Sequence, residues 1–86
     1  MKVVKFGGTS LASAAQIRKV ISIVRADPAR RIVVVSAPGK RTPDDTKVTD
    51  LLIACARTAL AGGPGDAEVA AVIGRYAEIA ADFGLP

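Results

Sequence analysis

The run of four β-branched residues at positions 32–35 (IVVV) is the feature that most restricts how this chain can fold. A continuous apolar run of this kind is typical of a strand that is buried on both faces, as in a parallel sheet covered by helices. A second strand pattern occupies residues 2–6, and apolar residues recur at helical spacing from Leu11 to Val24 between the two strands. Strand, helix and strand in this order predict an α/β fold that opens with a βαβ unit.

The rest of the chain predicts two further helices. A polar loop covers residues 37–46, and helical patterns follow over residues 48–59 and 66–83, on either side of a glycine-rich break at 62–65. Two strands and three helices cannot readily cover both faces of a parallel sheet. We therefore expect residues 1–86 to be a truncated part of a larger parallel sheet flanked by helices, or to be completed by another copy.

The composition disfavours several classes of function. A single cysteine, Cys55, and the lack of histidine exclude an internal disulfide and argue against a zinc site. No apolar run approaches the roughly 20 residues that span a bilayer, and residues 2–6 begin a strand rather than a secretory leader. These features predict a cytoplasmic protein without a membrane partner. The net charge is +4, but no aromatic residues interleave with the scattered basic ones, which disfavours nucleic acid as a partner.

The segment KFGGTS, which starts at Lys5, combines the features of a phosphate-binding turn. A lysine near the end of a buried strand is costly unless an anion faces it. Gly7 and Gly8 allow the backbone to approach a ligand closely. A helix that starts at once, capped by Thr9 or Ser10, would direct its free amides to the same place. The alternative is an ordinary strand-to-helix turn whose lysine reaches out to solvent.

Two further hydroxyl residues are candidates for binding. Ser36 follows directly on the second strand, at the end where ligands gather in open α/β sheets, and Thr49 lies in the first turn of the next helix. Either has a structural alternative, because Ser36 could bond nearby backbone and Thr49 could cap its helix. Residues 39–42 (GKRT) do not fit a Walker A loop and are interpreted as a basic rim that attracts anions. Cys55 is expected to be a small core residue.

The segment KFGGTS resembles the opening motif of the aspartate kinases, which are members of the amino acid kinase family. The resemblance continues in order through residues 34–37 (VVSA), 47–52 (KVTDLL) and 75–85. It covers essentially the whole sequence, and it implies that residues 1–86 are an N-terminal fragment of an amino acid kinase catalytic domain. The fold implied is the βαβ start of the amino acid kinase fold.

The resemblance implies a transfer of the ATP γ-phosphoryl group to the side-chain carboxylate of L-aspartate, on the route to lysine, threonine and methionine. Magnesium would accompany the phosphates. The positions that match the ATP-binding motif are Lys5, Gly7, Gly8 and Ser10. Among them Lys5 would be the catalytic residue, in contact with the transferred phosphoryl group. Ser36 and Thr49 match the family's positions for the amino acid substrate.

Two other interpretations stay open at this point. Relatives within the same fold, such as acetylglutamate or glutamate kinase, share a lysine and glycines at this strand end. A second possibility is a non-catalytic fragment that associates with itself. For the 86 residues alone we expect no kinase activity, since the family's acidic active-site residues and second lysine lie further along the polypeptide. We also expect a homo-oligomer, because strand edges and apolar helix faces lack partners.

Overall fold

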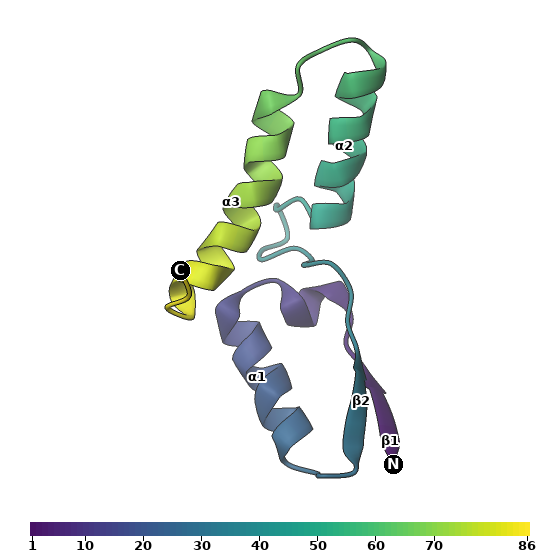
Figure 1. Cartoon of the computed structure of the whole chain (residues 1–86), viewed down its shortest axis with the longest axis vertical. Coiled ribbons are helices and arrows are strands. Elements are labelled where there is room, and N and C mark those ends of the chain that lie inside the picture. Colours follow the sequence, from purple (N-terminus) through teal and green to yellow (C-terminus); the bar gives the residue numbers. More distant parts are fainter.

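The computed structural model describes all of residues 1–86 and arranges them in two lobes (Figure 1). The first lobe is a βαβ unit made of β1 (Lys2–Lys5), α1 (Ala14–Arg25) and β2 (Arg30–Val34). The second lobe is a hairpin of two helices, α2 (Val48–Leu60) and α3 (Asp66–Asp82). The molecule measures 49 × 26 × 25 Å, so the lobes are stacked end to end.

The two strands pair in parallel, as the βαβ pattern predicted. Lys5 lies opposite Val34, and the amide of Phe6 extends the pairing by donating to the carbonyl of Val34 at 2.9 Å. Helix α1 covers one face of this sheet, and Val4 and Phe6 are half-buried while Val3 and Lys5 are exposed. Successive residues of β1 therefore point to opposite faces of the sheet.

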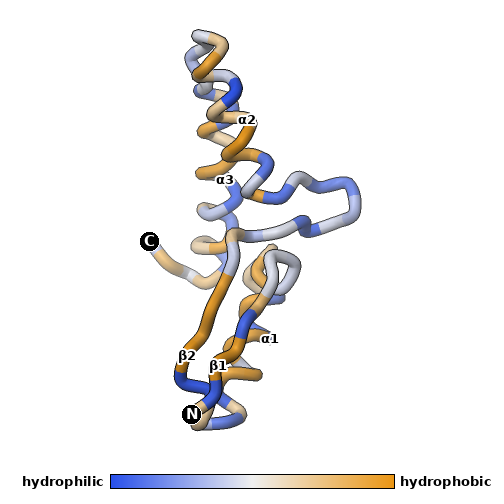
Figure 2. The backbone as a smooth tube through the Cα atoms, turned by 90° about the vertical axis from the view of Figure 1, so that its right-hand side faces the viewer, coloured by the Kyte–Doolittle hydropathy of each residue, from blue (hydrophilic) through white to orange (hydrophobic).

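The other face of the sheet is open. Ile32 and Val34, which point to this face, are both 44% exposed, although the sequence predicted a strand covered on both faces. The prediction is wrong for this chain because only α1 packs on the sheet, and the helical hairpin lies beyond the end of the sheet rather than over its second face. The upper part of β2 is continuously apolar, whereas the apolar residues of β1 lie between two lysines (Figure 2). Only nine of the 86 residues are buried, which agrees with the expectation that this chain cannot close a core by itself.

The first helix begins later than expected. Residues Gly8–Leu11 form a 3-10 helix, η1, and α1 begins at Ala14 with Ser13 as its N-cap, where Oγ of Ser13 accepts from the amide of Gln16 at 3.4 Å. The prediction that Thr9 or Ser10 caps α1 is therefore wrong. Both residues at the end of this turn, Leu11 and Ala12, are buried.

Two contacts join the lobes at the end of α3. The guanidinium of Arg18 in α1 donates to the carbonyl of Asp82 at 2.8 Å, and it lies 4.8 Å from the centre of the Phe83 ring. This places a cation on the negative end of the α3 dipole, which favours the docked arrangement. None of the helices combines the length and the hydropathy needed to cross a membrane.

Candidate functional site

Five of the six candidate residues gather at one end of the sheet. Because the strands are parallel and Lys5 lies opposite Val34, the chain leaves β1 and β2 at the same edge. The candidates at this edge are Lys5, Gly7, Gly8, Ser10 and Ser36. Parallel pairing therefore brings together residues that lie up to 31 positions apart in the sequence.

The charged and hydroxyl groups at this edge are unengaged. Lys5 is exposed and its ammonium forms no ion pair or hydrogen bond within the chain. Ser36 is exposed as well, and its hydroxyl bonds no nearby backbone. The structural alternative for Ser36, a bond to the strand exit, is therefore contradicted. Both groups are available to a ligand.

The turn after β1 offers free backbone amides. The amides that open a 3-10 helix have no acceptor inside it, and no loop, turn or cap bond starts from Gly7, Gly8 or Thr9. A Cβ added to Gly7 would meet nothing within 4 Å, and its φ of −76° suits any residue. The fold of this chain thus gives no reason for glycine at position 7, whereas close approach of a ligand would.

A second glycine-containing loop packs directly on this turn. The amide of Gly39 donates to the carbonyl of Gly8 at 2.7 Å, and a Cβ on Gly39 would lie 2.6 Å from the carbonyl carbon of Gly8. Gly39 is buried, so it is part of the packing rather than of a solvated rim. The sequence analysis missed this role. The Pro38-Gly39 pair was the available signal, since glycine beside proline marks a tight turn.

The sixth candidate, Thr49, lies in the first turn of α2. The amide of Val48 donates to the carbonyl of Pro38 at 3.0 Å, and the Val48 side chain is fully buried, which fixes the start of α2 against the loop that leaves β2. The N-cap of α2 is Lys47, whose side chain makes no capping bond. The alternative that Thr49 caps the helix is thus wrong, and its exposed hydroxyl forms no hydrogen bond.

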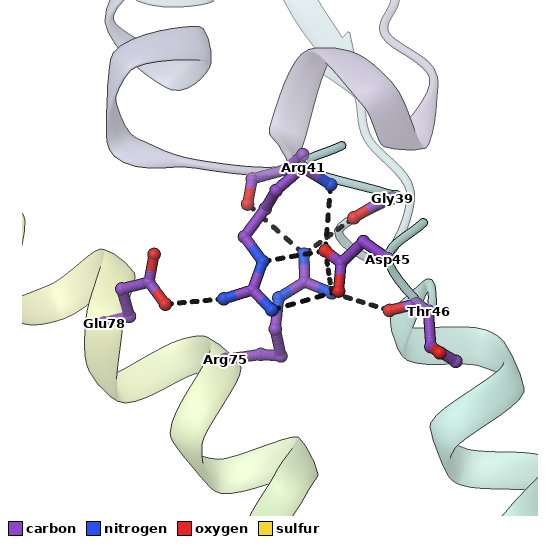
Figure 3. Close-up of polar contacts among 7 residues, drawn as sticks. Gly39, Arg41, Asp45, Thr46, Arg75 and Glu78 are labelled. Carbon is purple, nitrogen blue, oxygen red and sulfur yellow. Dashed lines mark hydrogen bonds and ion pairs between the residues drawn. The ribbon is translucent and has the colours of Figure 1, made fainter. Parts of the chain in front are cut away.

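A buried arginine from α3 lies at the centre of these loops (Figure 3). Arg75 is 4% exposed, and its guanidinium donates to the carbonyls of Thr46 at 2.9 Å, Gly39 at 2.6 Å and Ala12 at 3.3 Å. The sequence analysis did not single it out. Its spacing was a usable signal, because Arg75 follows Val72 by three residues and precedes Ile79 by four, which puts a cation on an apolar helix face.

Arg41 is neutralised by two carboxylates on the surface of this cluster (Figure 3). Its guanidinium contacts Asp45 at 2.7 and 3.0 Å and Glu78 in α3 at 2.6 Å. The hydrogen bonds from Arg41 hold the pKa of the Asp45 carboxyl well below its usual range, and the two carboxylates raise the pKa of Arg41. The basic rim expected at residues 39–42 is therefore reduced to Lys40.

A cavity of about 440 Å³ lies beside this network, between the loop and the two helices of the hairpin. Charged residues of both signs line it, among them Arg41, Asp45 and Glu78. The cavity belongs to the second lobe, whereas Lys5 and Ser36 lie at the strand ends of the first lobe. None of the six candidate residues lines this cavity.

Known proteins with similar sequences and folds show which family the chain belongs to. The family model described as the amino acid kinase family matches residues 1–80. This chain belongs to the amino acid kinase family. Aspartokinase 3 of Bacillus subtilis (strain 168) is 62% identical over 85 residues, which cover 99% of this chain and 19% of that protein. The crystal structure of Clostridium acetobutylicum aspartate kinase is 42% identical, with a TM-score of 0.92 over 98% of this chain and 19% of that one.

This member of the amino acid kinase family therefore spans about a fifth of the length of the relatives that it matches. The α/β fold class predicted from the sequence is confirmed, and the two-stranded parallel sheet with three helices matches the start of an aspartate kinase fold. The resemblance to aspartate kinases is confirmed as well. Acetylglutamate and glutamate kinases are not favoured by these matches.

Proposed function

We propose that residues 1–86 form the N-terminal part of the catalytic domain of an aspartate kinase, a phosphotransferase with a carboxylate acceptor. The observation that carries the proposal is the unengaged Lys5 ammonium beside the free amides of residues 7–9, at the carboxyl edge of a parallel sheet. The 62% identity to an aspartokinase supports aspartate as the acceptor.

Lys5 and the glycine turn would bind the phosphates of ATP. Phosphoryl transfer depends chiefly on positioning and on neutralising charge, and a lysine next to several free amides supplies both. Gly7 leaves open space where a phosphate oxygen could reach the backbone. Ser10, in the 3-10 helix that follows, would complete the phosphate contacts.

Ser36 and Thr49 would hold aspartate, since both hydroxyls are exposed and neither is used within the chain. A side-chain carboxylate oxygen of aspartate would attack the γ-phosphorus, and the bond to the oxygen that bridges to the β-phosphate would break. ADP leaves with that electron pair, and the product is an acyl phosphate. Such a product would enter the synthesis of lysine, threonine and methionine in the cytoplasm.

Magnesium is a companion of the nucleotide phosphates in this proposal. No group of three His, Cys, Asp or Glu residues in the chain could hold a metal ion. We therefore assign magnesium no ligand among residues 1–86. The 86 residues alone are still expected to lack turnover, because the acidic residues and second lysine that the resemblance assigns to the active site are not among them.

The proposal is tested in the full-length enzyme with the variants Lys5→Ala and Thr49→Val. Acyl phosphate is trapped with hydroxylamine, and the rates are measured against both substrates. Lys5→Ala removes an ammonium that neutralises the transferred group, so kcat should fall a hundred- to thousandfold, or about 3–4 kcal/mol. Thr49→Val should raise KM for aspartate much more than KM for ATP.

Thr58→Val is the matched control, because it removes a hydroxyl from the other end of the same helix. That hydroxyl contacts Glu68 in α3, so the control should change stability and leave both KM values unchanged. Turnover of Lys5→Ala at the wild-type rate would refute the proposed role of Lys5. An equal rise of both KM values in Thr49→Val would remove Thr49 from the aspartate site.

A further inference from the structure

We infer that Arg75 is a positioning residue that sets the relative placement of the three segments carrying the proposed site. This inference rests on the proposed function described above for the identity of the site. Arg75 lies in α3 and is buried, and its terminal nitrogens are engaged by backbone carbonyls. Its effect would be transmitted through the backbone of the loops that it binds.

Each of the three carbonyls bound by Arg75 belongs to a different site segment. Ala12 ends the turn that begins with the glycines, Gly39 comes three residues after Ser36, and Thr46 comes three residues before Thr49. These carbonyls lie 63, 36 and 29 positions from Arg75 in the sequence. One side chain therefore links the proposed phosphate turn to both ends of the loop that carries the proposed aspartate hydroxyls.

The chemistry of this contact requires arginine. A guanidinium presents five donors in a planar fork, whereas a lysine ammonium is a single point on a flexible stem. Here the two terminal nitrogens reach three carbonyls, and the carboxylate of Asp45 lies 3.5 Å from Nη1. Burying a cation is costly unless it is hydrogen-bonded, and these contacts meet that cost while Nε is left without a partner.

Few other bonds hold these segments to one another. The amide of Gly39 binds the carbonyl of Gly8, and the amide of Val48 binds the carbonyl of Pro38. Removing Arg75 would leave these two backbone bonds, and the exposed ion pair of Arg41 with Glu78, to fix the spacing of the phosphate turn and the Thr49 helix. The helices would keep their internal bonds, so the expected result is misplaced site residues in a protein that remains folded.

The test uses the full-length enzyme with Arg75→Met, Arg75→Lys and a control, Arg57→Met. Arg57 is exposed in the last turn of α2 and its side chain makes no hydrogen bond or ion pair. Steady-state kinetics and hydrogen exchange of the folded proteins are both measured. Both Arg75 variants should lose about a hundredfold in kcat/KM for aspartate, the loss expected for misplacement by about 1 Å. Arg57→Met should match the wild type.

Hydrogen exchange provides the readout that does not depend on turnover. It should accelerate in residues 8–13 and 37–48 of the Arg75 variants and stay unchanged within α1 and in the middle of α2. Faster exchange throughout the chain would overturn the inference, because Arg75 would then be a general stabilising residue. If Arg75→Met does not fold, Arg75→Lys decides the question.

Wild-type kinetics in Arg75→Lys would also overturn the inference, since a point charge would then be sufficient. If the wild-type enzyme itself shows no aspartate kinase activity, the proposed function fails. The positioning role is still decided in that case, by whether faster exchange is confined to the two loop segments.

Discussion

The three glycines in and beside the candidate site, Gly7, Gly8 and Gly39, differ in how closely other atoms surround them. Gly39 is required by the fold, because any side chain there would meet the backbone of Gly8 and Thr9 at 2.6–2.8 Å. Gly8 is crowded by the carbonyl oxygen of Ala37 at 3.0 Å. Gly7 faces open space. Gly8 and Gly39 thus permit the two loops to pack together, whereas Gly7 would leave room for a ligand.

We expect Gly39→Ala to lower the free energy of unfolding by about 1–3 kcal/mol, because the backbone must move to relieve the overlap. Gly7→Ala should leave it unchanged or raise it by up to about 1 kcal/mol, since the unfolded chain loses freedom and no clash arises. Urea unfolding at one fixed protein concentration measures both. Equal midpoints for the two variants would contradict the close approach of the loops.

The polar loop between β2 and α2 is an element whose position depends on charge. Arg41 and Asp45 pair within the loop, and Arg41 joins it to Glu78 in α3. The loop that leads into α2 and Thr49 is thereby tied to α3. The sequence identified this stretch as a polar loop with a basic rim, and it could not show the pairing of Arg41 with Glu78, which lies 37 residues further along.

The lowered pKa of Asp45 predicts how stability depends on pH. A carboxyl with a depressed pKa in the folded state stabilises above its unfolded value of 3.8, and this contribution is lost as the pH falls below that value. Asp45→Asn should therefore be less stable than the wild type at neutral pH and lose less stability on acidification. Urea unfolding between about pH 6 and pH 2 measures the difference. Asp44→Asn is the control, since the exposed Asp44 forms no ion pair. If Asp45→Asn and the wild type lost stability equally on acidification, this account would be contradicted.

At the scale of the whole molecule, the chain leaves much of its apolar surface uncovered. The open face of the sheet carries Val3, Ile32 and Val34, and the outer faces of α2 and α3 carry Leu52, Ile73 and Tyr76, all exposed by more than a third. A parallel sheet is normally covered on both faces. The two lobes meet through a small buried junction, so the surface of each is large for its volume.

We expect the isolated 86-residue chain to self-associate, because exposed strand edges of this composition pair with other copies. Light scattering coupled to size exclusion should give a mass above the monomer's 8.8 kDa. Ile32→Lys on the open face should lower the apparent mass, whereas Ala15→Lys on the exposed side of α1 should not. A compact monomer that unfolds cooperatively would contradict the expectation.

The order of elements and the position of the first turn were predictable from the sequence. Periodicity is a local property, so the strands expected at residues 2–6 and 32–35 and the helices expected at 48–59 and 66–83 were identified to within two residues. Parallel pairing then followed from the βαβ order, and with it the meeting of Lys5 and Ser36 at one edge. The start of α1 was missed, because buried packing of Leu11 and Ala12 overrides the capping preference of Thr9 and Ser10.

Only the tertiary structure decided which groups are free and which are engaged. The contact of Gly39 with Gly8, the three carbonyls bound by Arg75 and the neutralised charge of Arg41 all join segments far apart in the sequence. No local pattern encodes such contacts, since each depends on how the two lobes meet. The residue types of the proposed site are therefore contained in short motifs, whereas their placement depends on packing between distant segments.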